Sequence, residues 1–289
     1  HYLDYSMIDT PLSLYIHFPW CARKCPYCDF NSHEVRSDIP ETRYVETLLR
    51  DLEFELESDP RKTLRSIFMG GGTPSLFSPE AISNLFAGIK DRFDISEAEI
   101  TLEANPGTFD QGHFDGYSEA GVNRLSIGAQ SFSAEALTQL GRIHSPGEIE
   151  LAYYGARQAG FNRINIDLMH GLPGQTLGNA LNDLKRAIEL EPEHISWYQL
   201  TIEPNTRFYK HPPILPKDPV LEDIFIAGND LLQSAGFLQY EVSAYSLPSE
   251  ESRHNLNYWH FGDYLGIGAG AHGKISSANQ VIRTTKNKM

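Results

Sequence analysis

The stretch Leu12-Ser-Leu-Tyr-Ile-His-Phe-Pro-Trp-Cys-Ala-Arg-Lys-Cys-Pro-Tyr-Cys28 joins a short apolar run to all three cysteines of the chain. The run over residues 12–17 has the composition of a buried strand. Cys21, Cys25 and Cys28 follow it within one loop, so their thiolates can face a single centre. Because the cysteines are odd in number and clustered, they form a poor disulfide framework and a good set of metal ligands.

The order of strand, loop and helix then repeats along the chain. Strands are predicted at residues 12–17, 66–69, 99–103, 124–127, 163–167 and 194–198, with a further strand at 240–245. Helices are predicted at 40–57, 78–91, 110–120, 133–140, 147–159, 177–190 and 219–235. Alternating strands and helices form a parallel sheet with right-handed crossovers. Six such units are fewer than the eight of a full TIM barrel, so we expect an α/β fold built as a partial barrel or an open sheet.

The composition excludes several classes of protein. The chain has 289 residues, of which 40% are hydrophobic and 21% charged, which is typical of a folded globular protein. The net charge of −14 disfavours nucleic acid as the main partner, because phosphate binding depends on clustered Lys and Arg. Neither a signal peptide nor an apolar run long enough to span a membrane is visible. With its cysteine usage, this predicts a reducing, cytoplasmic location.

We expect three segments. Residues 1–10 form an N-terminal extension, whose six residues before Met7 are either native or a vector remnant. Residues 11–205 form the barrel, and residues 206–289 form a short α+β extension. Chemistry is expected in the loops after the strands, because the carboxyl ends of parallel strands carry the sites of such folds.

Three thiolates in one loop allow two kinds of metal site. A structural zinc site normally has four protein ligands, so here it would need His17 or His33 to complete it. Three cysteines can instead hold three irons of a [4Fe–4S] cluster and leave the fourth iron without a protein thiolate. An open metal position implies a ligand from outside the protein, which favours the cluster.

The glycine-rich turn Gly70-Gly-Gly-Thr-Pro-Ser75 follows the second predicted strand. Four more motifs lie at or beyond strand ends: Leu102-Glu-Ala-Asn-Pro106, Asn123-Arg-Leu-Ser-Ile-Gly-Ala-Gln-Ser-Phe132, Gly141-Arg-Ile-His144 and Asn165-Ile-Asp-Leu-Met-His-Gly-Leu-Pro-Gly174. With the cysteine loop, these motifs resemble the radical S-adenosylmethionine (SAM) superfamily. Within it they resemble the coproporphyrinogen-dehydrogenase-like family, over roughly residues 11–273. The fold that this resemblance implies is a partial (β/α)6 TIM-type barrel.

The resemblance implies a [4Fe–4S] cluster on Cys21, Cys25 and Cys28, with SAM beside it. The residues that it places around SAM are Tyr15, Tyr27, Gly71, Gly72, Thr73, Glu103, Gln130, Arg142 and Asp167. Such groups suit the ligand, because carboxylates accept hydrogen bonds from hydroxyl and ammonium groups while an arginine pairs with a carboxylate. The alternative for each polar residue is a structural hydrogen bond at a strand end. Thr73 departs from the pattern, since many relatives carry Glu there.

Two features separate the dehydrogenase branch of this family from its heme-chaperone branch. The dehydrogenases carry a further cysteine two positions after the third, where this chain has Phe30. The motif His254-Asn-Leu-Asn-Tyr-Trp259 is typical of the chaperones. The resemblance therefore implies a protein that binds heme through His254, beside Tyr258 and Trp259. The alternative is that His254 caps a turn and Trp259 only packs.

The chaperone branch further implies transfer of heme to acceptor hemoproteins such as respiratory-chain enzymes. It also implies a homodimer, peripheral membrane contact and a C-terminal domain that we expect to follow this segment. Two other functions stay open. One is an oxygen-independent coproporphyrinogen III dehydrogenase, which decarboxylates propionates by radical chemistry. The other is a barrel that uses the cluster only structurally.

Overall fold

The computed structural model describes residues 11–56, 59, 61–277 and 280–288, so the expected N-terminal extension, residues 1–10, lies outside the described residues. The six strands predicted for the barrel are confirmed: β1 (Leu12–Phe18), β4 (Ser66–Gly71), β5 (Glu99–Ala104), β6 (Arg124–Gln130), β7 (Ile164–His170) and β8 (His194–Gln199). They lie side by side and parallel in this order. The predicted α/β partial barrel is therefore correct.

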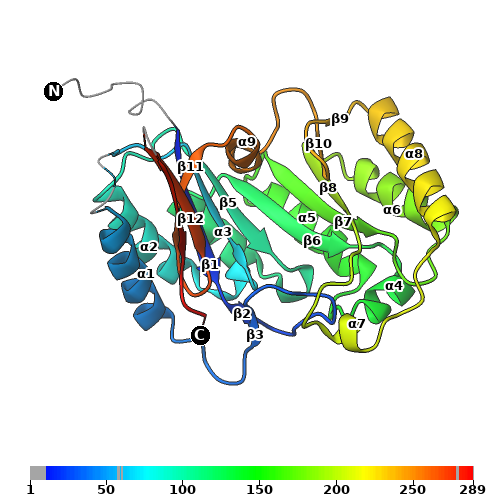
Figure 1. Cartoon of the computed structure of the whole chain (residues 1–289), viewed down its shortest axis with the longest axis horizontal. Coiled ribbons are helices and arrows are strands. Elements are labelled where there is room, and N and C mark those ends of the chain that lie inside the picture. Colours follow the sequence, from blue (N-terminus) through cyan, green and yellow to red (C-terminus); the bar gives the residue numbers. More distant parts are fainter. Residues whose placement is uncertain (1–10, 57–58, 60, 278–279, 289) are drawn as a thin grey trace.

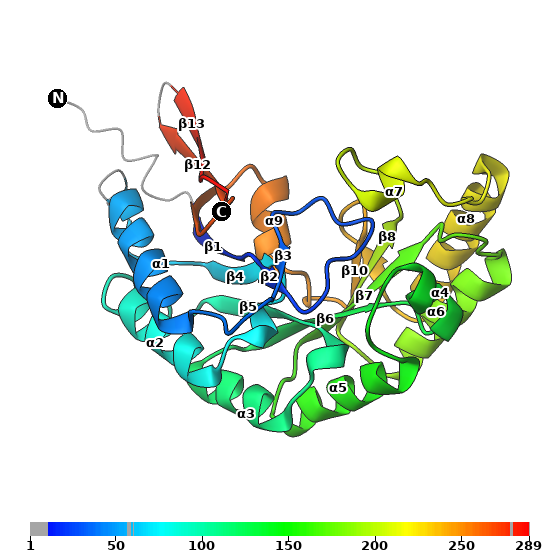
Figure 2. The ribbon, with the colours of Figure 1, turned by 90° about the horizontal axis from the view of Figure 1, so that it is seen from below.

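The predicted helices also form, with each end shifted by at most one residue. They are α1 (Glu41–Leu56), α2 (Pro79–Lys90), α3 (Gln111–Ala120), α4 (Ala134–Gln139), α5 (Pro146–Gln158), α6 (Leu177–Glu189) and α8 (Asp218–Ser234). Figure 1 shows the open, twisted sheet, and Figure 2 shows helices α1, α2, α3, α5 and α6 along its outer, convex side. The start of α2 illustrates the local rules, because Ser78 Oγ accepts a hydrogen bond from Ala81 N and Pro79 occupies the first turn.

Residues after 205 extend the same sheet at both of its edges. A seventh parallel strand, β11 (Asp263–Ile267), pairs with β1, and it was not predicted. β12 (His272–Ser277) pairs antiparallel with β11, and β13 (Gln280–Thr285) pairs antiparallel with β12. β10 (Ala244–Ser246) and β9 (Leu238–Gln239) extend the other edge. Two short helices, α7 (Arg207–Lys210) and α9 (Arg253–Trp259), complete this part.

The predicted strand at residues 240–245 is wrong over its first four residues. Residues 240–243 form the bend between β9 and β10, and Tyr240 N donates to Ala244 O across it. The error has a physical reason: the stretch lacks the Gly, Pro or Asn that usually marks a turn, and its alternation of large and small residues imitates a strand.

No helix in the part of the chain that the structure describes combines the length and apolar character needed to cross a membrane.

The core lies between the sheet and the outer helices, and it includes fully buried side chains from every barrel strand.

Gly228 tests the packing of α8 on this core. A Cβ at Gly228 would lie 1.9 Å from Cη2 of Trp197, a ring only 2% exposed that has no room to move. We expect Gly228→Ala to lower the free energy of unfolding by ~1–3 kcal/mol, which is the usual cost of overpacking. Gly147→Ala is the matched control, because that helical glycine has no atom within 4 Å of the added carbon. Urea denaturation measures both, and equal stabilities of the two variants would contradict the packing.

Candidate functional site

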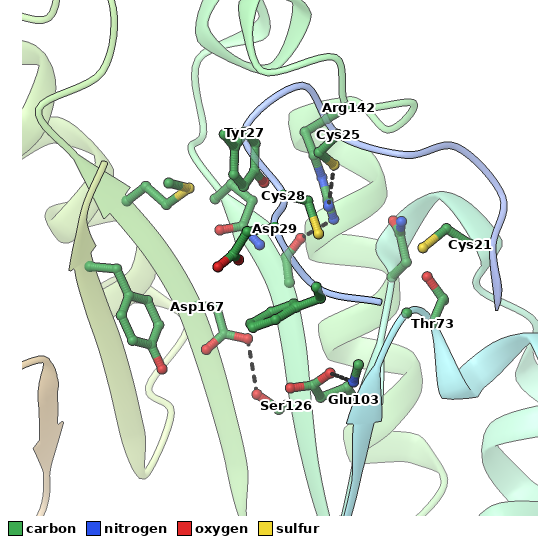
Figure 3. A pocket seen from close by; sticks show the side chains of 18 of the residues that line it. Cys21, Cys25, Tyr27, Cys28, Asp29, Thr73, Glu103, Ser126, Arg142 and Asp167 are labelled. Carbon is green, nitrogen blue, oxygen red and sulfur yellow. Dashed lines mark hydrogen bonds between the residues drawn. The ribbon is translucent and has the colours of Figure 1, made fainter. Parts of the chain in front are cut away.

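A cavity of about 410 Å³ opens at the carboxyl ends of the barrel strands. Eleven of the thirteen site residues predicted from the sequence line it: Cys21, Cys25, Tyr27, Cys28, Gly71, Gly72, Thr73, Glu103, Gln130, Arg142 and Asp167. They come from the strands β4, β5, β6 and β7, from the segment after β1 that holds the cysteines, and from the loops after β4 and α4. Figure 3 shows the three cysteines along one side of the cavity and two carboxylates across from them. The fold therefore brings together residues up to 146 positions apart in sequence.

The cysteine loop is held by its own backbone. Cys21 lies in β2 (Trp20–Cys21), which pairs with β3 (His33–Glu34), and the Lys24 ammonium donates to the carbonyls of Phe30 and Ser32 across the loop. All three cysteines are free thiols. Burial raises the pKa of Cys21 and Cys28. A positive group or a metal is needed to hold them as thiolates.

Arg142 supplies positive charge next to these thiols. Its Nη1 lies 3.4 Å from Cys25 Sγ, and its Nη2 donates to Gly128 O at 2.8 Å. Its Nε is buried and has no hydrogen-bond partner within the described ranges. A guanidinium with an unused donor in a cavity wall suits an anionic group such as a carboxylate of a bound molecule.

The floor of the cavity is acidic. Burial and the neighbouring Asp167 raise the pKa of Glu103 to about 8, although Gly71 N donates to its Oε2 at 3.2 Å. Asp167 accepts hydrogen bonds from Ser126 and Asn165, at 3.0 and 2.8 Å, while burial raises its pKa as well. Two buried carboxylates that share one cavity favour a ligand that brings positive charge.

The glycine-rich turn follows β4 and packs against the start of the cysteine loop. Gly71 has a φ of 108°, and a Cβ there would lie 2.4 Å from the His17 ring. Gly72 N donates to Phe18 O, and the buried Thr73 donates from its backbone N to Trp20 O at 2.7 Å. Packing of the turn against the first loop therefore requires glycine at position 71, independently of any ligand.

Gln130 ends β6 in a strained conformation. Its φ of 69° is left-handed, and the register with β7 shifts between Ile127 and Gln130. A non-glycine residue in this region is uncommon and marks functional sites more often than other places. The irregularity directs the end of the strand into the cavity wall.

The zinc alternative gains no support. Both ring nitrogens of His17 are engaged, Nδ1 with the Tyr15 hydroxyl at 3.0 Å and Nε2 with Asn31 O at 2.8 Å. Among the described residues, no three His, Cys, Asp or Glu side chains converge on one position as the ligands of a single ion. A zinc site requires that convergence, whereas a cluster takes each thiolate on a different iron.

Two predicted residues, Tyr15 and His254, do not line the cavity. Tyr15 lies beneath it in β1. His254 lies further down, on α9, with its ring stacked on Phe68 at 4.2 Å between centroids and in edge contact with Tyr258 at 4.8 Å. It is 8% exposed, burial lowers its pKa to about 3, and its Nδ1 has no partner in the described structure. His254 is thus a neutral, buried imidazole with an unused nitrogen.

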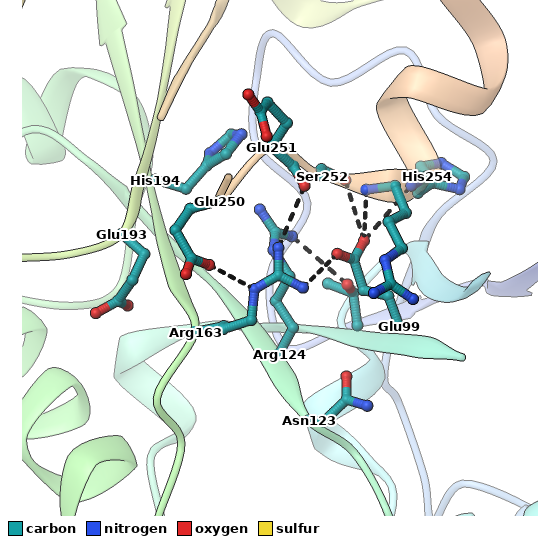
Figure 4. Close-up of polar contacts among 12 residues, drawn as sticks. Glu99, Asn123, Arg124, Arg163, Glu193, His194, Glu250, Glu251, Ser252 and His254 are labelled. Carbon is teal, nitrogen blue, oxygen red and sulfur yellow. Dashed lines mark hydrogen bonds and ion pairs between the residues drawn. The ribbon is translucent and has the colours of Figure 1, made fainter. Parts of the chain in front are cut away.

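Glu99 fixes α9 at the amino end of β5. Its Oε1 accepts from Arg253 N at 2.9 Å, and its Oε2 pairs with Arg163 Nη1 at 2.6 Å (Figure 4). A carboxylate at the start of a helix is favourable because the first backbone N–H groups are otherwise unpaired. At the carboxyl end of α9, the Tyr258 and Trp259 side chains are exposed, and the exposed fraction of Trp259 is 56%.

Sequence reasoning missed other residues in the cavity wall, among them Asn105, Met169, Tyr198 and Glu203. Tyr198 closes the sixth predicted strand, so the rule that chemistry gathers at strand ends could have found it. Glu203 stands in an irregular segment and had no such signal.

Three comparisons place this architecture among known proteins. Residues 15–187 match the family model described as "Radical SAM superfamily". The chain is 54% identical over 280 residues to "Heme chaperone HemW" of Escherichia coli (strain K12), covering 96% of this chain and 74% of the relative. It is 37% identical to "Heme chaperone HemW" of Bacillus subtilis (strain 168), covering 93% and 72%.

A solved structure shares the fold over nearly the whole chain. It is the coproporphyrinogen III oxidase HemN from Escherichia coli, described as a radical SAM enzyme, with a TM-score of 0.84 and 26% identity. The match covers 97% of this chain and 67% of that protein. Because identity to the Escherichia coli chaperone is about twice the identity to HemN, the branch predicted from Phe30 and the 254–259 motif is confirmed. The chain belongs to the HemW heme chaperone family of the radical SAM superfamily.

Proposed function

We propose that this chain binds heme and passes it to acceptor hemoproteins, on a scaffold that holds a [4Fe–4S] cluster and SAM. The observation that supports the scaffold most strongly is the cavity at the strand ends, in which three free thiols, an arginine with an unused donor and two buried carboxylates meet. These groups match the iron ligands, the carboxylate and the positive charge that such a pair of cofactors brings.

Different residues would hold the cluster and SAM. Cys21, Cys25 and Cys28 would ligate three irons, and Arg142 would pair with the methionyl carboxylate. Gly71, Gly72, Thr73 and Gln130 shape the wall, Tyr27 packs beside the thiols, and Glu103 with Asp167 accepts hydrogen bonds and balances positive charge. When bound, cluster and SAM supply one-electron chemistry. The polar floor and the packed first loop keep both ligands oriented.

Heme would bind at α9, in the segment 206–289. His254 is proposed as the iron ligand, since a neutral imidazole is the usual protein ligand for that metal. The exposed rings of Tyr258 and Trp259 offer an apolar wall for the porphyrin. Ligation requires the His254 ring to leave its stack on Phe68, so heme binding and a shift of α9 would occur together.

We further propose a cytoplasmic protein that acts as a homodimer, touches membranes peripherally and serves acceptors of the respiratory-chain type.

The dehydrogenase alternative rests on the likeness to HemN. Against it stands Phe30, which is 60% exposed at the cavity wall where that branch carries a further cysteine. Anaerobic incubation with coproporphyrinogen III should therefore give no vinyl product.

The heme ligand is tested with His254→Phe, which keeps an aromatic ring in the stack and removes both nitrogens. We expect heme affinity to fall at least about tenfold, with a changed Soret spectrum, because the axial bond is lost. His260→Ala is the comparison, since His260 is exposed at the end of the same helix. Heme titration followed by absorbance decides, and an unchanged spectrum for His254→Phe would refute the assignment.

The pH dependence of stability tests the cavity floor. A carboxyl whose pKa is about 8 when folded and 4.5 ordinarily stabilises the fold fully below pH 4.5, and this contribution is lost as pH rises towards 8. Without ligands, wild type should therefore lose stability relative to Glu103→Gln over this range, by at most ~1.4 kcal/mol per pH unit.

Asp183→Asn is the control for that experiment. Asp183 is also buried, but its pKa is raised only to about 6 and it lies outside the cavity wall. The stability difference between wild type and Asp183→Asn should therefore stop changing near pH 6. Melting curves are recorded at steps of ~1 pH unit. A stability difference between wild type and Glu103→Gln that stays constant from pH 5 to 8 would contradict a raised Glu103 pKa.

A further inference from the structure

A column of polar side chains, two of them fully buried and three half-buried, runs through the barrel interior from the cavity floor to α9. It begins at Asp167, which accepts from Asn165 Nδ2 at 2.8 Å. Asn165 Oδ1 faces His194 Nδ1 at 2.6 Å, and His194 Nε2 faces the Tyr240 hydroxyl at 2.6 Å. Tyr240 in turn accepts from Asn255 Nδ2 at 3.2 Å. Every link is a direct contact between side chains, and Asn165 and His194 are both at least 98% buried.

The donors in this column all point the same way. An ionised Asp167 can only accept, so the amide nitrogen of Asn165 faces it and the amide oxygen faces His194. His194 must therefore carry its proton on Nδ1. Burial lowers its pKa well below the ordinary value, so the ring is neutral and Nε2 accepts from the Tyr240 hydroxyl.

Side branches strengthen the column. Ser126 Oγ accepts from Asn165 Nδ2 and donates to the second oxygen of Asp167 at 3.0 Å, and Ser196 Oγ donates to Asn165 Oδ1 at 3.0 Å. Chains of hydrogen bonds that point in one direction polarise one another. Each link towards Asp167 thus helps a buried carboxylate to stay charged beside Glu103.

Tyr240 is the junction between this column and α9. Its oxygen accepts from Ser252 N, at the cap of α9, and from Asn255, the second residue of the 254–259 motif. Its hydroxyl has no capacity left, because it donates one bond and accepts two. Tyr240 touches neither the cavity wall nor the His254 ring stack.

We propose that Tyr240, His194 and Asn165 are positioning residues that couple the SAM cavity to the heme-binding helix. The coupling rests on the proposed function, and it runs through the column from Asp167 to Asn255. A ligand that binds Asp167 changes the polarisation of the whole column and tightens the attachment of α9. When one hydrogen bond of the column is missing, binding at Asp167 no longer affects α9.

Tyr240→Phe opens that gap by removing one oxygen. We expect the reconstituted, anaerobic protein to bind SAM about fivefold or more weakly, which is a common size for coupling between sites. SAM should also reduce deuterium uptake at residues 253–259 in wild type and leave it unchanged in Tyr240→Phe. Equilibrium dialysis and hydrogen exchange with mass spectrometry provide the two readouts. Asn255→Ala, which removes only the outermost donor, should act in the same direction.

Tyr245→Phe is the matched control. Tyr245 is a buried tyrosine of β10 whose hydroxyl donates to Asn229 outside the column, so its loss costs stability without opening the gap. The proposal is overturned if Tyr240→Phe binds SAM as Tyr245→Phe does and α9 still responds. If wild type itself fails to bind SAM, the proposed function falls as well, and the two failures are thereby distinguished.

Discussion

The parallel register of the barrel strands is the constraint on which the site depends. Phe18 pairs with Gly71, Ala104 with Ile127, and Gln130 with Leu168, so successive strands end at one edge. Each strand delivers its following loop to that edge, and no single loop carries a complete site. Gln130 has a left-handed backbone although it is not glycine, and it ends β6 at the cavity wall, so backbone strain is held at the site.

The interior of the barrel connects this edge to the opposite one. A barrel of apolar side chains alone would isolate the two ends, whereas here a hydrogen-bonded column starts at Asp167 in the cavity wall, and Phe68 stacks on His254. Both end on α9, which Glu99 holds at the amino ends of the strands. A chaperone needs to sense its cargo and to release it, and a short helix tied to a cofactor cavity offers a physical route for that dependence.

Local rules correctly predicted six of the seven expected strands and all seven expected helices, because each carries a run or face of its own, as in 12–17 or 78–91. They failed where a partner lies far along the chain: β11 pairs with β1 across some 250 residues. Gly266 of β11 has a packing role that no local pattern shows, because a Cβ there would lie 1.9 Å from His272 O of the returning strand. The motifs named eleven of the residues in the cavity wall, but nothing in their spacing could show that Tyr15 and His254 lie outside it.

The central claim is that three thiolates leave one cluster position open for SAM beside an acidic floor. Electron paramagnetic resonance of the anaerobically reconstituted and reduced protein tests it most directly. The account predicts about four irons per chain and a cluster spectrum that changes when SAM is added, because SAM enters the open position. A cluster whose spectrum is the same with and without SAM would contradict it.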